Sequence, residues 1–443
     1  MQNMKIPAVA ASLFIALAIL LIPLPLEENA HRMLSIALFM AAMWVSEAMP
    51  LHVTALLGSV LMIIFVPLEA KTVFAPYFSP AVVLLLGGFF YARAMQKHGL
   101  DRHLATWLIS HFGTDPKWFL LGMMSATAFL SFWVSNTATA AIMMPIAIFA
   151  IGSSGVGKRI SSFAKATVMG VAFAATIGGM ATIVGTPPNA IAVENLAEHG
   201  IRISFFDWVY HALPYVCLLV PLTWLILVAI YRPEIKRVTL PQKTEAWTKE
   251  QQKTVALGLA IVLLWMTSFY HKVPDSAISV LAVVALYAAD ILDKEDMGRI
   301  DWAILLLVGG GLSLGTSIEA SGLASSIGMA LTTLVSGQSE FVLFLSVIAF
   351  AVIVTAFMSN TSTAALIVPI ITALAISIGP MVRELTILAG LASSLNFLTP
   401  FGTPPSAMAY SSGHISVLDM LKAGIPITIA AMLLLAALAW LYW

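Results

Sequence analysis

Long apolar stretches separated by short polar connections make up most of the chain. The first runs from Ile6 to Leu26 and has no small-residue cleavage site after it, so we expect a membrane span rather than a removed leader. Further stretches lie at 33–50, 52–68, 79–97, 117–150, 166–195, 206–231, 254–271, 275–292, 302–320, 340–378, 384–412 and 416–443. At ~20 residues per crossing, this pattern predicts an all-α polytopic membrane protein.

The most polar stretch, residues 232–253, is expected to be a solvated cytoplasmic linker, and it separates two halves that resemble each other. SFWVSNTATAAIMMPIA at Ser131–Ala147 matches TAFMSNTSTAALIVPII at Thr355–Ile371, 224 residues later. Two further pairs keep the same order and begin at Gly185 and Gly402 (GTPPNAIA and GTPPSAMA) and at Leu84 and Leu305 (LLLGG and LLLVGG). Three ordered pairs indicate a duplication, and internal repeats with interrupted apolar segments are typical of secondary transporters.

Composition narrows the class of protein. Of the 443 residues, 60% are hydrophobic and only 10% are charged, with a mean hydropathy of +0.95, which excludes a soluble enzyme and a disordered protein. The net charge of +0 gives no sign of nucleic-acid binding. The single cysteine, Cys217, excludes an intrachain disulfide and a cysteine-built metal site.

The basic residues predict an orientation. If the N-terminus is cytoplasmic and each Ser-Asn-Thr segment is a hairpin that enters and leaves on one side, 17 of the 22 lysines and arginines lie inside. The five outside are Arg32, Lys71, Arg202, Lys272 and Arg383. The first hairpin then enters from the inside and the second from the outside, so the repeats are inverted and the C-terminus is external.

Two amphipathic segments precede the hairpins. Leu100, Leu104, Trp107 and Leu108 share one helical face, while Asp101 to His103 lie off it. The weaker counterpart is residues 323–336. Each is either a short connecting helix or a surface arm that lets one domain shift against another.

Asn136 and Asn360 are the most informative positions. Each lies in a Ser-Asn-Thr triplet within an apolar stretch, where asparagine disfavours mid-helix geometry. A helix break at hydrocarbon depth is tolerated only where it is buried in protein or lines a cavity. The alternative is polar contact between helices, and the occurrence at matched repeat positions favours a binding site.

A GTPP motif interrupts the next apolar segment of each half, at Gly185-Thr186-Pro187-Pro188 and at Gly402-Thr403-Pro404-Pro405. They predict either simple kinks or helix breaks whose second pieces begin at the prolines.

Together with the two Ser-Asn-Thr triplets, such breaks give four helix N-termini, which suit an anion with several oxygens. No lysine or arginine lies in these motifs, so nearby cations would have to offset the anion's charge. Hydroxyl and carbonyl oxygens suit hard monovalent cations, which predicts anion uptake coupled to Na⁺.

The paired SNT and TPP motifs resemble those of the divalent anion–sodium symporter family of dicarboxylate, citrate and sulfate carriers. That resemblance covers nearly the whole chain. It implies a homodimer with about 11 transmembrane helices and two re-entrant hairpins per protomer, and scaffold and transport domains that move as an elevator. The scaffold would comprise 1–114 and 254–337, and the transport domain 115–231 and 338–443, within the repeats 1–231 and 254–443.

The resemblance also implies site residues. The implied substrate contacts are Asn136, Thr137, Thr186, Asn360, Thr361, Thr403 and Pro404. The implied Na⁺ ligands are Ser131, Ser135, Asn136 and Gly185 in a first site and Thr355, Ser359, Asn360 and Gly402 in a second. Ser406 departs from the family, which often repeats the asparagine of the first copy there.

Several functions remain open at this point. The expected function is sodium-coupled symport of C4-dicarboxylates such as succinate, malate and fumarate across a bacterial inner membrane, with no catalytic residues. Alternatives within the family are a sodium-independent exchanger and a sulfate or citrate carrier. An anion channel is a rival of another class, whereas a serine hydrolase is disfavoured because no histidine lies in either hairpin. Glu47 and Glu319 are either proton-linked groups or polar helix ends.

Overall fold

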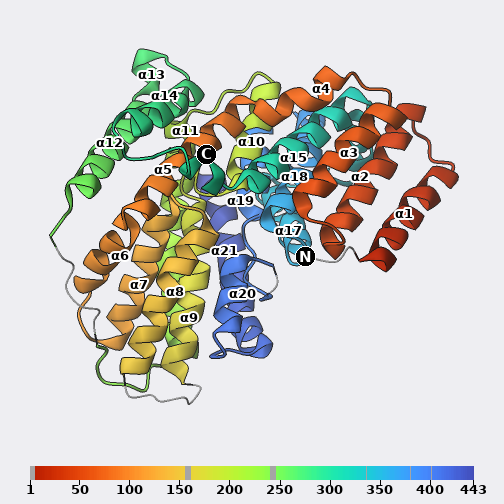
Figure 1. Cartoon of the computed structure of the whole chain (residues 1–443). Coiled ribbons are helices and arrows are strands. Elements are labelled where there is room, and N and C mark those ends of the chain that lie inside the picture. The colour runs from red at the N-terminus through yellow and green to blue at the C-terminus, as the bar shows by residue number, and fades with distance from the viewer. Residues whose placement is uncertain (1–4, 155–160, 240–245, 336, 380, 401) are drawn as a thin grey trace.

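The computed structural model describes residues 5–154, 161–239, 246–335, 337–379, 381–400 and 402–443 (Figure 1). Within these ranges the chain is helical and has no strand. Seven of the described helices are long and apolar enough to cross a bilayer, and four shorter apolar helices accompany them. The all-α membrane fold predicted from the apolar pattern is confirmed.

The two halves contain helices in the same order. The first half contains α1 (Ile6–Leu21), α2 (Glu28–Ser46), α3 (Leu51–Phe65), α4 (Ala70–Phe74), the 3₁₀ turn η1 (Ala75–Phe78), α5 (Pro80–Lys97), α6 (Leu100–Ser110), α7 (Pro116–Ser131), α8 (Asn136–Ser153), α9 (Ser162–Gly179), α10 (Pro187–Glu198) and α11 (Phe205–Ile230). The second half contains α12 (Lys249–Met266), α13 (Ser268–His271), α14 (Asp275–Ala288), the 3₁₀ turn η2 (Asp296–Arg299), α15 (Trp302–Ala320), α16 (Leu323–Val335), α17 (Glu340–Thr355), α18 (Asn360–Ile378), α19 (Val382–Ala392), α20 (Pro404–Ser411) and α21 (Val417–Tyr442). Helices α15 to α21 therefore repeat the order of α5 to α11.

The last helices of the two repeats, α11 and α21, run antiparallel. At one end the Tyr231 hydroxyl, just after α11, donates to the Asp419 carbonyl in the first turn of α21 at 2.8 Å. At the other end the Tyr442 hydroxyl of α21 donates to the Tyr210 carbonyl near the start of α11 at 3.5 Å. Because equivalent helices point in opposite directions, the repeats are inverted, as the sequence predicts.

Helices of one repeat pack between helices of the other. Helix α5 packs on α14, and α15 packs on α3. Helix α10 packs on both α18 and α19, whereas α20 packs on both α8 and α9 (Figure 1). The helix after each GTPP motif is therefore held by the hairpin of the opposite repeat. This exchange brings the motifs of both halves into one part of the fold.

The described residues of the polar stretch 232–253 are mostly exposed, and hydrogen bonds also attach this stretch to the neighbouring helices. Residues 240–245 lie outside the described part of the chain. Before them, the Val238 N–H donates to the Thr114 carbonyl at 2.9 Å, and the Phe163 N–H donates to the Glu234 carboxylate at 3.1 Å. After them, α12 already begins at Lys249. The connection is therefore attached to the ends of the membrane helices on both sides.

The predicted amphipathic segments form α6 and α16. Asp101 and His103 are buried, whereas Trp107 is 46% exposed. Helix α6 lies against α7, and the His103 and Trp247 rings contact each other at a tilt, with 4.6 Å between their centroids.

Candidate functional site

Each Ser-Asn-Thr triplet lies where the chain reverses between two packed helices. Residues 132–135 join α7 to α8, and residues 356–359 join α17 to α18. Ser135 and Ser359 cap the second helix of each hairpin, accepting hydrogen bonds from the N–H groups of Ala138 at 3.4 Å and Ser362 at 3.2 Å. The serine before each asparagine thus starts a helix whose N-terminus carries partial positive charge.

The first hairpin tip is fixed to α9 through Ser131. Its Oγ lies 2.8 Å from Asn136 Oδ1 and 2.6 Å from the Ala175 carbonyl, so the hydroxyl orients the asparagine amide. Thr137 follows and is exposed. The amide oxygen of Asn136 is therefore held inward while the next hydroxyl faces open space.

The second hairpin tip repeats this arrangement with Thr355 in place of the serine. Its Oγ1 lies 3.2 Å from Asn360 Oδ1 and 2.7 Å from the Ser393 carbonyl of the following segment. Thr361 is half-buried rather than exposed. The two hairpin tips therefore share the same pattern of hydroxyl contacts as well as similar sequences.

The two GTPP motifs are helix breaks, and their second pieces begin at Pro187 and Pro404 as predicted. Both preceding threonines, Thr186 and Thr403, have extended backbones. Thr403 Oγ1 caps α20 by accepting from the Ser406 N–H at 3.3 Å, whereas the Thr186 side chain makes no capping bond to α10. With α8 and α18, four helix N-termini belong to the four motifs.

Side-chain amides support both breaks, but from different positions. In the first repeat Asn189 Nδ2 donates to the carbonyls of Gly179 at 3.0 Å and Thr182 at 2.7 Å. At the spacing of 217 residues, Asn189 corresponds to Ser406 and Gly179 corresponds to Asn396. Asn396 thus supplies the amide that Ser406 lacks. The sequence does not mark Asn396 as a site residue, because the equivalent position in the first repeat is a glycine.

Asn396 connects the second break to its own hairpin. Its Nδ2 donates to the carbonyls of Thr355 and, at 3.4 Å, Met358. Its Oδ1 is buried and has no hydrogen-bond partner among the described residues, and the same holds for Ser394 Oγ. A Cβ on Gly402 would lie 2.2 Å from Asn396 Nδ2 and 2.4 Å from its Oδ1, so only glycine fits there. Unpartnered buried oxygens are unusual and suit an unseen cation or water.

Oxygen atoms also converge in the first repeat. A Cβ on Gly179 would lie 2.2 Å from Asn136 Oδ1 and 3.2 Å from the Gly185 carbonyl. One on Gly185 would lie 2.5 Å from the Gly179 carbonyl and 2.8 Å from the Ser131 carbonyl. Four oxygens without a nearby positive charge from the chain are the ligands that hard cations prefer.

Three of the predicted substrate positions are threonines without side-chain hydrogen bonds in the described part of the chain, of which Thr137 is exposed, Thr361 half-buried and Thr186 buried. The side chains of Thr137, Thr186 and Thr361 have no hydrogen-bond partner within the described ranges. Thr403 Oγ1 lies 3.0 Å from Ser406 Oγ, and Pro404 is exposed. Neutral donors at helix N-termini can bind carboxylate oxygens, and the adjacent oxygen clusters can bind the compensating cations.

Comparison with known proteins agrees with this chemistry. A family model described as citrate transporter matches residues 41–382. The sodium-dependent dicarboxylate transporter SdcS of Staphylococcus saprophyticus is 33% identical, over 93% of this chain and 86% of its own. An uncharacterized transporter of Haemophilus influenzae is 30% identical, over 96% of this chain and 94% of its own.

Solved structures show the likeness of fold. The YdaH transporter of Alcanivorax borkumensis covers 84% of this chain and 86% of its own with a TM-score of 0.60, at only 12% identity. These relatives are transporters rather than enzymes. The chain belongs to the citrate transporter family of membrane carriers, within the divalent anion–sodium symporters that its paired motifs resemble.

Proposed function

We propose that this protein couples the inward movement of Na⁺ to the uptake of a C4-dicarboxylate such as succinate, malate or fumarate. The observation that carries the proposal is a cluster of oxygens near helix N-termini, where threonine hydroxyls have no hydrogen-bond partner among the described residues. No lysine or arginine lies in the motifs. A dianion bound by neutral groups at membrane depth would be costly, and cations beside it reduce that cost. The relatives named sodium-dependent dicarboxylate transporters support the choice of ion and substrate.

In this proposal the motifs divide into two ion sites and one substrate site. The first ion site comprises Ser131, Ser135, Asn136 and Gly185, and the second comprises Thr355, Ser359, Asn360 and Gly402. The dicarboxylate contacts Asn136, Thr137, Thr186, Asn360, Thr361, Thr403 and Pro404. Ser135 and Ser359 already cap helices, so their hydroxyls contribute through the remaining lone pair.

We further propose that residues 115–231 and 338–443 move as a transport domain against a scaffold of 1–114 and 254–337 in a homodimer. An asymmetry between the repeats supports this motion. Ala365 and Pro369 of α18 pack closely on glycines of α15, while the equivalent Ala141 and Pro145 of α8 are exposed. Inverted repeats in unequal surroundings are expected of a carrier that alternates between two related states. The protein would lie in a bacterial inner membrane with its N-terminus cytoplasmic and C-terminus external.

Transport by purified protein in proteoliposomes tests the proposal. Initial uptake of radiolabelled succinate is measured with Na⁺, K⁺ or choline outside, and unlabelled malate, citrate and sulfate are added as competitors. We expect uptake only with Na⁺, and competition by malate. Equal rates in the three cations would instead favour the exchanger, and competition by citrate alone would favour the tricarboxylate that the family description names.

A further inference from the structure

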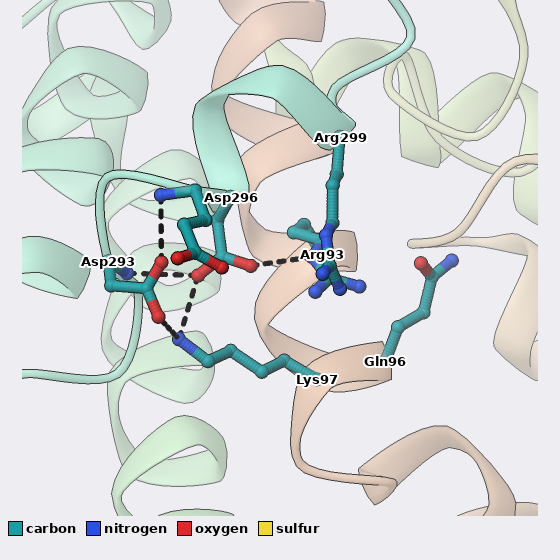
Figure 2. A pocket seen from close by; sticks show the side chains of 7 residues that line it. Arg93, Gln96, Lys97, Asp293, Asp296 and Arg299 are labelled. Carbon is teal, nitrogen blue, oxygen red and sulfur yellow. Dashed lines mark hydrogen bonds and ion pairs between the residues drawn. The ribbon is translucent and has the colours of Figure 1, made fainter.

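A polar cavity of about 330 Å³ lies away from the four motifs, where the end of α5 meets the connection between α14 and α15 (Figure 2). Three basic side chains, three acidic side chains and Gln96 line it. Its formal charge is balanced, so what it can bind depends on which of these groups are already paired.

Two of the acids are paired within the wall. Asp296 is 2% exposed and accepts from Lys97 Nζ at 2.7 Å and Arg93 Nε at 2.8 Å, and Lys97 also contacts Asp293 at 2.8 Å. Burial alone would raise the pKa of Asp296, but hydrogen bonds from Lys97, from the Asp293 N–H and from Arg93 outweigh it and hold the pKa at about 2. Asp296 therefore stays ionised and keeps Lys97 engaged at any physiological pH.

Hydrogen-bond donors remain unused on the other side of the cavity. Arg299 is exposed and forms no ion pair or hydrogen bond with any described residue. Arg93 uses Nε for Asp296, which leaves its two terminal nitrogens, and the Gln96 amide is also unpaired within the described ranges. Figure 2 shows Lys97 turned toward Asp293 and Asp296, while Gln96 points away from them and Arg299 extends toward Arg93. Guanidinium groups in this arrangement suit the oxygens of a phosphate.

The internal repeat separates this cavity from the transport motifs. Helix α15, the counterpart of α5, contains neither lysine nor arginine. The motifs for transport occur in both repeats, whereas these cationic side chains occur in one. The cavity is therefore not part of the duplicated transport motifs.

Two exposed apolar side chains lie in and beside the 3₁₀ turn that lines the cavity. Met297, in the same 3₁₀ turn as Asp296 and Arg299, is 49% exposed, and Trp302 is 36% exposed. The Trp302 indole N–H donates to the Met297 carbonyl at 3.1 Å, which fixes the ring beside the turn. Tryptophan is enriched at the interface between lipid headgroups and acyl chains.

We propose that this cavity binds the phosphate of an anionic phospholipid, with Arg93, Gln96 and Arg299 donating to its oxygens and the acyl chains lying along Met297 and Trp302. The apolar surface favours lipid over a soluble phosphate, which would gain nothing from it. Glu295 is the one acid of the wall that forms no ion pair among the described residues, and it weakens the site.

Thermal stability of the full-length protein in detergent tests the proposal. Phosphatidylglycerol or phosphatidylcholine is titrated in, and glycerol 3-phosphate and inorganic phosphate form separate arms. The variant is Arg299→Gln. Because the Arg299 side chain forms no hydrogen bond or ion pair with the described residues, this change should not itself destabilise the fold. The matched control is Lys294→Gln, which removes the same charge from an exposed neighbour outside the cavity.

We expect phosphatidylglycerol, but not phosphatidylcholine, to raise the Tm of the wild type and of Lys294→Gln. Arg299→Gln should need about fivefold more phosphatidylglycerol for the same shift, and Glu295→Gln should need less lipid than the wild type. Equal titrations for Arg299→Gln and Lys294→Gln would overturn the site. An equal Tm shift with glycerol 3-phosphate alone would overturn lipid as the source of the phosphate. Succinate uptake enters none of these measurements, so the result is independent of the proposed transport.

Discussion

Two asparagine side chains, each oriented by a hydroxyl from the preceding helix, lie at the centre of the proposed site. Asn136 and Asn360 present their amide oxygens toward the oxygen clusters, held by Ser131 and Thr355. Replacing either asparagine by alanine should remove an ion ligand and a substrate contact together. We expect initial succinate uptake to fall at least ~10-fold, which corresponds to ~1.4 kcal/mol for one such contact.

The control for this prediction is Asn29→Ala, an exposed asparagine near the start of α2. Uptake by all three variants is compared at equal amounts of reconstituted protein. Near-normal uptake by both Asn136→Ala and Asn360→Ala would leave these side chains only a role in holding helices together.

Gly179 provides a second test of the first oxygen cluster. A methyl group there would lie 2.2 Å from Asn136 Oδ1 and would push that oxygen away from the other carbonyls. We expect Gly179→Ala to raise the Na⁺ concentration for half-maximal uptake about tenfold, within the cost of overpacking a filled site. Gly152→Ala is the matched control, since its methyl group would meet nothing within 4 Å. Unchanged Na⁺ dependence in Gly179→Ala would place the ion elsewhere.

The sequence draws attention to the motif residues because each motif contains amino acids that are costly at hydrocarbon depth. It does not predict Asn396, because one asparagine outside a repeated motif carries no such signal. Its role depends on the hairpin carbonyl of Thr355, 41 residues earlier, which only the folded chain brings close.

Helices of the two repeats are joined by an ion pair at one end of the fold. Lys165 Nζ of α9 lies 2.5 Å from Asp419 Oδ1 of α21, and both side chains are mostly buried. Lys165→Met should leave the aspartate without its cation and lower the free energy of unfolding by about 1–3 kcal/mol. The measurement is the Tm of the purified protein.

Lys422→Met is the control for that change. Lys422 Nζ lies 5.9 Å from the centre of the Tyr231 ring, much as Lys165 does at 5.8 Å, but Lys422 forms no ion pair among the described residues. A smaller loss of Tm in this variant is expected. Equal losses would mean that the aromatic contact, rather than the ion pair, stabilises this end.

Helix positions are predicted more reliably than their environments. The prolines locate the first residues of α10 and α20, because proline is accepted at the first helical position. The sequence places Asp101 and His103 off the apolar face of α6 but does not show that the fold buries both of them in the protein, which only the packing of α6 on its neighbours reveals. Composition likewise predicts a solvated connection at 232–253 without showing its backbone hydrogen bonds, such as the one from Val238 to Thr114, because such bonds do not depend on the side chains.

The inverted arrangement predicts that the two hairpins enter from opposite sides of the membrane. Single cysteines at Ser153, Ser154, Gly337 and Ser339, in a Cys217→Ala background, are exposed to an impermeant maleimide on intact cells. Positions 337 and 339 should label, and 153 and 154 should label only after permeabilisation, because the first hairpin is adjacent to Lys165 and most basic residues. Labelling of all four from one side would exclude a site reached from both faces.

In the proposed function, Na⁺ and a dicarboxylate bind together at the paired motifs. Two ligands that favour each other must do so reciprocally, so Na⁺ should tighten succinate binding by the same factor as succinate tightens Na⁺ binding. The most direct measurement is equilibrium binding of radiolabelled succinate to the purified protein while K⁺ replaces Na⁺ at constant ionic strength. We predict that the Kd for succinate falls steeply with Na⁺ concentration, with a logarithmic slope approaching about two for two ion sites. An equal Kd for succinate in Na⁺ and in K⁺ would contradict the joint binding of Na⁺ and the dicarboxylate.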